Sequence, residues 1–168
     1  MISNSLPANA RVWVYQSNRA FTAQEMAEIE LRLKDFVNQW TSHKVGVEGD
    51  GAIIYNRFIV LMADEEKVKL GGCSIDSSVH FIKALERDYG LNFFDRWNIA
   101  YLQGDKVLSC NRADFEKLVE GGKVTEDTIV FNNLVNTKQQ LQTAWQTAYG
   151  KSWLKNLAPL NTGFTSIL

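Results

Sequence analysis

The chain has 168 residues, of which 45% are hydrophobic and 22% charged, values typical of a globular protein with one domain or two small ones. A net charge of -1 excludes the strongly basic surface expected of a general nucleic-acid or anionic-membrane binder. The first residues lack a basic region followed by an apolar run, and no stretch approaches the roughly eighteen apolar residues of a membrane span. We therefore expect a soluble cytoplasmic protein without membrane insertion.

The first two elements have clear strand and helix patterns. Arg11–Gln16 is β-branched and aromatic, which predicts a strand. Thr22 and Glu25 form a T-x-x-E capping box, with Phe21 and Met26 placed as the hydrophobic staple of a helix. Apolar residues then recur at helical spacing, at Met26, Ile29, Leu33, Phe36, Val37 and Trp40. We expect this face of the helix to pack on a sheet.

Two or three antiparallel strands and a second helix are expected next. Residues 44–63 are rich in β-formers, and we interpret E-G-D-G at 48–51 and Asn56-Arg57 as interruptions between strands. The helix is predicted from Ile75 to Tyr89, with Gly90 ending it. Its expected core face holds Ile75, Val79, Ile82, Leu85 and Tyr89, and its wet face holds Asp76, His80, Lys83 and Arg87.

A further strand at Trp97–Leu102 completes the order βαββαβ, which is that of a ferredoxin-like unit. The remaining sequence predicts a turn, a strand, a helix, a strand and a last helix that Thr137 opens. No linker composition separates the two parts. The prediction is an α+β fold, with a ferredoxin-like part at 1–103 and a hairpin-helix-strand-helix extension at 104–168, packed together as one structural unit.

Residues with metal or redox chemistry are few. Cys73 and Cys110 occur without an export signal, so we expect reduced thiols and not a disulfide. The only histidines of the sequence, His43 and His80, have no Cys or His partner at metal-ligand spacing. We expect no metal and no cofactor.

The best chemical candidate is Cys73, in the stretch L-G-G-C-S-I-D-S-S-V. A thiol just before a helix N-terminus meets the positive end of the helix dipole, which favours the nucleophilic thiolate. This predicts a thiol-dependent enzyme or redox sensor, with Ser74, Asp76, Ser77 and His80 as candidate binding residues. The alternative is a packed or capping Cys73, because Asp76 competes for the same potential and no histidine is tied to the thiol by spacing. We expect this alternative, and with it slow alkylation of Cys73 in the folded protein.

Gly150, Lys151 and Ser152 match the last three letters of a phosphate-binding P-loop. The motif also requires a glycine five residues before its second glycine, and Trp145 occupies that position. We further expect a helix over Leu141–Tyr149 to precede the glycine, where a P-loop has a strand. The sequence therefore argues against ATP binding and ATPase activity.

Four runs spread over nearly the whole chain carry a family resemblance. They are A-R-V-W-V-Y-Q, Y-N-R-F, G-C-S-I-D-S-S-V and F-N-N-L-V. Together they resemble a family of short uncharacterised bacterial proteins that are often named "ABC transporter ATPase". The name has no support in the motifs of this chain, which lacks an L-S-G-G-Q-like signature as well as the P-loop. The resemblance implies membership of the family and no mechanism.

A local resemblance covers residues 112–131, R-A-D-F-E-K-L-V-E-G-G-K-V-T-E-D-T-I-V-F. This stretch is similar to the helix and following strand of GYF-like domains, with Phe131 where that pattern favours tryptophan. The resemblance implies binding of proline-rich peptides on an aromatic surface.

Stacking of nucleic-acid bases is a third possible function. Trp13 and Tyr15 share one face of the first predicted strand, as base-stacking aromatics do in RNA-binding sheets. The missing basic stripe argues against this function. The sequence therefore predicts a non-catalytic binding or adaptor module for a protein or peptide, and it leaves the oligomeric state open.

Overall fold

The chain folds into two compact units, each built from two separate stretches of sequence. Unit 1 comprises residues 1–96 and 132–146, and unit 2 comprises 97–131 and 147–168. The computed structural model describes residues 5–42, 48–66 and 70–157. The boundary therefore lies before Trp97 and not after residue 103, and the chain returns to unit 1 for fifteen residues within the expected extension.

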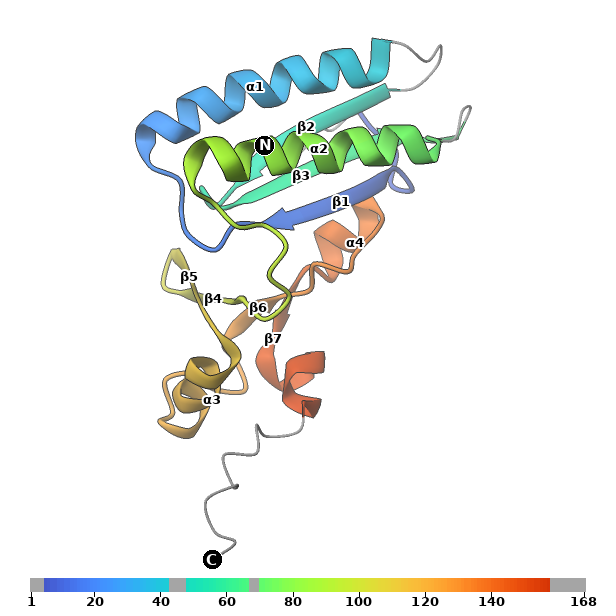
Figure 1. The fold of residues 1–168 in the computed structure, drawn as a ribbon. Coiled ribbons are helices and arrows are strands. Elements are labelled where there is room, and N and C mark those ends of the chain that lie inside the picture. The colour runs from blue at the N-terminus through green and yellow to red at the C-terminus, as the bar shows by residue number, and fades with distance from the viewer. Residues whose placement is uncertain (1–4, 43–47, 67–69, 158–168) are drawn as a thin grey trace, which may run out of the picture. The chain divides into compact units, whose positions relative to one another are not determined.

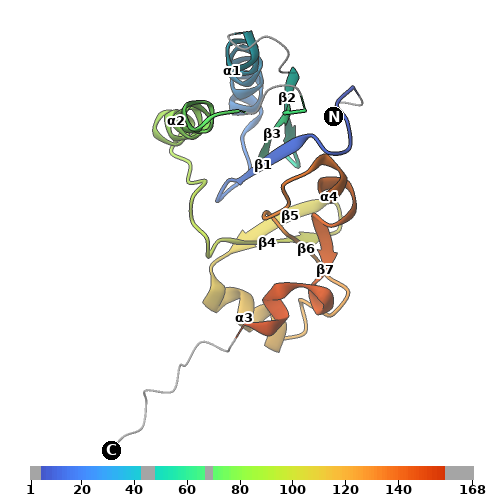
Figure 2. The same cartoon turned by 90° about the vertical axis from the view of Figure 1, so that its right-hand side faces the viewer.

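Unit 1 is a three-stranded antiparallel sheet with two long helices on one face (Figure 1; Figure 2). The strand order is β1-β3-β2, so β1 and β2 run parallel to each other on either side of β3. Its elements are β1 (Arg11–Gln16), α1 (Ala23–Ser42), β2 (Glu48–Ile54), β3 (Phe58–Asp64), α2 (Gly72–Tyr89) and the short α4 (Lys138–Thr143). The predicted strand at 11–16 is confirmed.

Unit 2 contains a second sheet, with the strand order β5-β4-β6-β7. Its elements are β4 (Ile99–Gln103), β5 (Lys106–Cys110), α3 (Arg112–Glu120), β6 (Ile129–Phe131), β7 (Gln146–Ala148) and the 3-10 turns η1 (Tyr149–Lys151) and η2 (Trp153–Asn156). Asn111 caps α3, because its Oδ1 accepts the N–H of Asp114 at 2.8 Å. The core of unit 2 includes Ile99, Phe115, Val124, Val130 and Leu154.

The α+β class is confirmed, whereas the ferredoxin-like topology is not. The strand expected to complete the first sheet is β4, and it pairs with β5 and β6 in unit 2. Residues of the returning stretch lie beside β1 instead. The N–H of Val12 donates to the carbonyl of Asn136 at 2.9 Å, and Arg11 forms an antiparallel bridge with Thr137. A sequence pattern shows that a strand exists, but the choice of neighbour depends on contacts distant in sequence.

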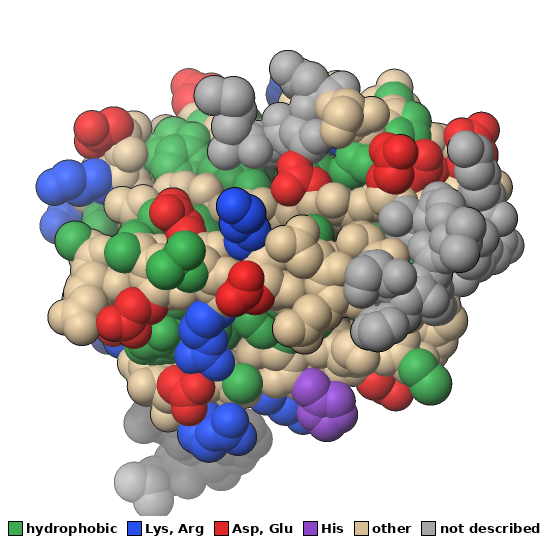
Figure 3. Space-filling model, turned by 90° about the horizontal axis from the view of Figure 1, so that it is seen from above, with side chains coloured by type: hydrophobic (Ala, Val, Ile, Leu, Met, Phe, Trp, Pro, Cys, Tyr) green, Lys and Arg blue, Asp and Glu red, His purple; other side chains and the backbone are tan. Residues whose placement is uncertain are grey.

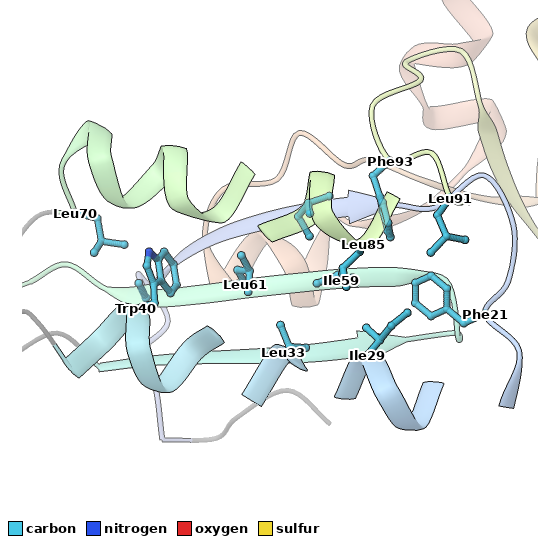
Figure 4. Close-up of a cluster of buried hydrophobic side chains, with 12 residues drawn as sticks. Phe21, Ile29, Leu33, Trp40, Ile59, Leu61, Leu70, Leu85, Leu91 and Phe93 are labelled. Atoms are coloured by element: carbon cyan, nitrogen blue, oxygen red, sulfur yellow. The ribbon is translucent and has the colours of Figure 1, made fainter. Parts of the chain in front are cut away.

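The capping box of α1 forms as predicted. The N–H of Glu25 donates to Thr22 Oγ1 at 3.2 Å, and the N–H of Thr22 donates to Glu25 Oε2 at 3.0 Å. The predicted apolar face of α1 packs on β3 and α2 (Figure 4). The buried members of this cluster are Phe21, Ile29, Leu33, Trp40, Ile59, Leu61, Ala63, Leu70, Ile82, Leu85, Leu91 and Phe93.

Residues 48–51 are not a turn but the first half of β2. A Cβ at Gly51 would lie 2.9 Å from Leu33 Cδ1, and one at Gly49 would lie 2.7 Å from Thr41 Cγ2. These glycines therefore let α1 approach the sheet closely. The turn comes later, at Tyr55 and Asn56, whose φ angles of 54° and 53° fit a hairpin turn. Two strands form within the described part of this stretch, and residues 43–47 lie outside the described residues.

The packing of α1 predicts a contrast between neighbouring residues. Leu33 is 4% exposed in the core, so Leu33→Ala should lower the free energy of unfolding by about 2 to 5 kcal/mol. Lys34 is exposed, so Lys34→Ala should change it by less than about 0.5 kcal/mol. Urea titration of both variants measures the difference. Equal midpoints and slopes would contradict the assigned face.

Candidate functional site

Helix α2 begins at Gly72, three residues before the predicted start, so Cys73 lies inside its first turn. The Cys73 side chain is exposed, and the N-cap residue Gly71 makes no side-chain capping bond. The expectation of a packed or capping Cys73 is therefore wrong. The early start arises because glycine is accepted at both the N-cap and the first helical position, where it leaves no side chain to mark the boundary.

Four candidate residues share one solvent-facing stripe of α2, and the fifth does not. Cys73, Asp76, Ser77 and His80 are exposed, and Ser77 Oγ donates to the carbonyl of Cys73 at 2.8 Å. Ser74 is buried, and its carbonyl accepts the Nε1–H of Trp40 at 3.0 Å. Ser74 is thus part of the packing between α1 and α2.

The stripe does not assemble a thiol–histidine pair. His80 follows Cys73 by seven positions, which separates them by about 10 Å along the helix axis. A nucleophile and its base need hydrogen-bond reach, about 3 Å. None of the ion pairs between described residues joins Asp76 to His80, and His43 lies outside the described residues.

The buried face of α2 is rotated from the predicted one. Its buried residues are Ser74, Ser78, Ile82 and Leu85, whereas Ile75 and Val79 are half-exposed. Ser78 is fully buried and hydrogen-bonds twice. Its Oγ donates to the carbonyl of Ile75 at 2.6 Å and lies 3.2 Å from the hydroxyl of Tyr15. Serine is not an apolar residue, so the hydrophobic pattern could not reveal this face.

A shallow hollow of about 940 Å³ lies between the second half of α2 and the segment that follows it. We call it the α2 hollow. It is lined by Val79, Lys83, Glu86, Arg87, Leu91, Asn92, Phe94 and Asp95, all in unit 1. No sequence pattern discussed above points to this hollow. The available signal was the pair Phe93-Phe94 directly after the helix stop, since only one of two adjacent rings can enter the core of such a turn.

Phe94 is the exposed aromatic residue of the α2 hollow. Its side chain is 43% exposed, whereas that of Phe93 is 7% exposed in the core. The ring of Phe94 meets that of Tyr15 edge-on at 6.0 Å between centroids, and Lys83 Nζ lies 6.0 Å from the Phe94 centroid. Burial raises the pKa of the Tyr15 hydroxyl, which keeps this supporting residue neutral.

Hydrogen bonds hold the wall of the α2 hollow in place. The N–H of Asn92 donates to Asn18 Oδ1 at 2.9 Å, and the N–H of Phe93 donates to Glu86 Oε2 at 2.8 Å. The N–H of Phe94 donates to Asn92 Oδ1 at 3.0 Å. A segment fixed in this way needs little ordering when a ligand arrives.

The predicted helix over Leu141–Tyr149 is wrong. Helix α4 ends at Thr143, and residues 146–148 form β7. Trp145 is 3% exposed, and its carbonyl accepts the N–H of Asn132 at 2.7 Å across the strands. Sheet pairing with a distant segment thus overrides a local apolar spacing. A strand does precede Gly150, which removes one of the two arguments made against a P-loop.

The region around Gly150 is nevertheless unsuited to a phosphate. Its N–H donates to the carbonyl of Glu126 at 2.9 Å, and a side chain at position 150 would collide with the Glu126 carboxylate. A carboxylate, paired with the ammonium of Lys155, therefore occupies the place where a phosphate needs donors. Ser152 Oγ donates to the carbonyl of Tyr149 at 2.7 Å and is only 5% exposed.

The aromatic residues of β1 serve the core. Trp13 and Tyr15 face the helices, and Trp13 meets Trp40 edge-on at 5.5 Å between centroids. They offer no open face for bases. On the helix side of unit 1, shown in Figure 3, basic side chains are interspersed with acidic ones and form no continuous stripe. These observations argue against nucleic-acid binding at this sheet.

The helix and strand of the GYF-like stretch form as α3 and β6, in the expected order. Phe131 is 6% exposed, so it does not offer a ring to a peptide. Trp97 is 48% exposed in the same unit, with the guanidinium of Arg112 5.1 Å from its ring centroid. The proline-binding surface implied by the resemblance stays a prediction.

Comparison with known proteins assigns no family and no function to the chain. Comparison of the chain with protein families, with curated proteins and with solved structures finds no match. Within residues 5–42, 48–66 and 70–157, no three His, Cys, Asp or Glu side chains are grouped to hold a metal ion. Among the helices of these same ranges, none is both long and apolar enough to cross a membrane. Both resemblances noted in the sequence remain predictions.

The two cysteines should alkylate at different rates. Cys73 is exposed, whereas Cys110 packs against the unit 2 core, where burial and then the charge of Asp114 raise the pKa of its thiol. At neutral pH Cys110 therefore holds less thiolate than an ordinary cysteine. We expect Cys110 to react with iodoacetamide more slowly than the exposed Cys73. Mass spectrometry of each site measures both rates. A Cys73 rate well above that of free cysteine would support the thiol-enzyme alternative.

The P-loop region predicts no response to nucleotide. Calorimetry with Mg-ATP should show no site tighter than about millimolar. Lys151→Ala should melt at the same temperature with and without ATP, as the unmodified chain should. A micromolar site that disappears in Lys151→Ala would contradict this expectation.

Proposed function

We propose that the protein is a cytoplasmic, non-catalytic binding module that holds a short segment of a partner protein in the α2 hollow. One observation carries the proposal: a phenylalanine ring, Phe94, is presented to solvent on a segment that hydrogen bonds fix in place. Aromatic side chains on rigid supports are frequent anchors of protein recognition, because they bury a large apolar area at little entropic cost.

The chemistry of the α2 hollow favours a particular kind of segment. Val79, Leu91 and Phe94 form the apolar part of its lining. This part suits one apolar side chain of a bound segment. Glu86 is engaged with the N–H of Phe93, and Arg87 Nε pairs with Asp88 at 3.5 Å. Lys83 lies over the Phe94 ring, with its ammonium beside the expected position of that apolar side chain.

A carboxylate next to an apolar residue therefore matches the α2 hollow. The ammonium of Lys83 is a compact positive charge with three N–H donors. One side of this ammonium faces the Phe94 ring, and its other sides are directed elsewhere. The thiol enzyme centred on Cys73 has weaker support, because the nearest candidate base on its stripe, His80, lies about 10 Å along the helix.

Selection of random peptides displayed on phage, with the full chain as bait, tests the proposal. Enriched peptides should carry an apolar residue beside an acidic one. Phe94→Ala should weaken their binding by at least about tenfold, since hot-spot truncations cost about 2 kcal/mol or more. Lys83→Ala should weaken it less, by a factor of about three to ten, and the loss should shrink at high salt.

Leu31→Ala is the matched control. Leu31 is 68% exposed on α1 and lies outside the α2 hollow, so its truncation should leave peptide affinity unchanged. Peptides that bind Phe94→Ala as tightly as the unmodified chain would refute the proposed site. A selection that enriches no peptide would refute the function.

A further inference from the structure

The loop between β1 and α1, residues 17–21, is attached to the sheet at both of its ends. The N–H of Ser17 donates to the carbonyl of Arg57 at 3.0 Å, and the N–H of Phe21 donates to the carbonyl of Asn56 at 2.7 Å. Both acceptors belong to the short connection between β2 and β3. The loop is therefore a firm support at this end of unit 1.

Two residues of this loop hold the chain where it reverses direction after α2. Asn18 makes two bonds with Asn92, because its N–H donates to the Asn92 carbonyl at 2.9 Å and its Oδ1 accepts the Asn92 N–H at 2.9 Å. Arg19 Nη2 donates to the carbonyl of Tyr89 at 2.8 Å, at the C-terminal end of α2. We call Asn18 and Arg19 the loop clamp.

The guanidinium of Arg19 is held in its orientation by Glu25. Its Nη1 donates to Glu25 Oε2 and its Nη2 to Glu25 Oε1, both at 2.9 Å. Such a bidentate pair fixes the plane of the guanidinium as well as its position. A cation beside the last carbonyls of a helix is also favoured by the helix dipole. Arg19 is therefore oriented toward the end of α2.

The loop clamp reaches Phe94 through Asn92. Asn92 Oδ1 accepts the N–H of Phe94 at 3.0 Å, so the position of Asn92 sets that of the Phe94 backbone. Between them, Phe93 enters the core shown in Figure 4, with its ring centroid 6.1 Å from that of Phe21. Neither Asn18 nor Arg19 lines the α2 hollow.

We propose that Asn18 and Arg19 are positioning residues of the α2 hollow, which set its affinity for a partner segment from outside it. The inference rests on the proposed function, because it names the residues that hold Phe94 ready for the partner. On a loose segment, binding would first have to order residues 90–95, and this entropic cost would weaken the affinity. The loop clamp orders these residues when the chain folds.

Hydrogen exchange tests the loop clamp in the absence of any peptide. Asn18 is exposed, so Asn18→Ala should fold, but its side chain can no longer accept the Asn92 N–H. The amides of Asn92 and Phe94 should then exchange at least about threefold faster. Phe94 keeps its own acceptor in this variant, so its faster exchange would show that the whole segment has loosened.

Peptide affinity tests the role of the loop clamp in binding. The probe is a peptide enriched in the phage selection, synthesised with blocked ends and titrated into the full chain. Asn18→Ala should bind it about three- to tenfold more weakly, as the loss of one hydrogen bond predicts. Arg19→Ala, which loses the bond to Tyr89, should weaken binding to a similar extent. The loss in Asn18→Ala should persist at high salt, unlike that in Lys83→Ala.

Asn18→Asp is the matched control, because its carboxylate oxygen can still accept the Asn92 N–H. At high salt, where the added charge is screened, it should bind the peptide as the unmodified chain does. Its Asn92 and Phe94 amides should also exchange as slowly as those of the unmodified chain.

The possible failures separate this inference from the proposed function. Unchanged exchange at Phe94 in both Asn18→Ala and Arg19→Ala would overturn the loop clamp. Faster exchange with unchanged peptide affinity would overturn its role in binding and leave the proposed function intact. An Asn18→Asp variant that binds as weakly as Asn18→Ala would also contradict the inference, since the bond to Asn92 would not be the cause. A selection that enriches no peptide refutes the proposed function, and with it any role of the loop clamp in binding.

Discussion

Strand β3 has to be covered on both faces, and unit 1 is organised around this requirement. All six residues from Phe58 to Ala63 are fully buried. Ile59 and Leu61 point to the helices, whereas Phe58 and its alternate neighbours point to the opposite face. On that face Trp145 meets Phe58 edge-on at 4.9 Å between centroids. The return of residues 132–146 to unit 1 thus helps to cover this face at Phe58.

Helix α2 packs inward through small residues and leaves its outer face free. Ser74 and Ser78 let it lie close to α1 and β1, and their polar groups bond to nearby backbone and to Tyr15. Its exposed stripe holds Cys73, and His80 on the same stripe lies about 10 Å from it along the helix axis. After the C-terminal end of α2 the chain reverses direction, and the ring of Phe94 packs edge-on against that of Tyr15. The α2 hollow therefore results from the same packing that buries the helix.

Prediction from the sequence succeeded where the deciding partner is close in the chain. The capping box needs only Thr22 and Glu25, so its three-residue spacing was enough. The prediction of the solvent-facing side of α2 is also confirmed, because the four charged or polar residues assigned to it are exposed. For the candidate site, Asp76, Ser77 and His80 do share a surface with Cys73. Their spacing could not show that Ser74 is buried.

The α+β class, the strand at 11–16, the α1 face and the absence of a complete P-loop motif follow from the sequence alone, because each depends on local spacing. The sheet in which β4 pairs and the role of the glycines in β2 depend on tertiary contacts. Gly51 looks like a turn residue until Leu33, eighteen positions earlier, is found 2.9 Å from where its Cβ would be. Such contacts join residues far apart in the chain, and no local periodicity encodes them.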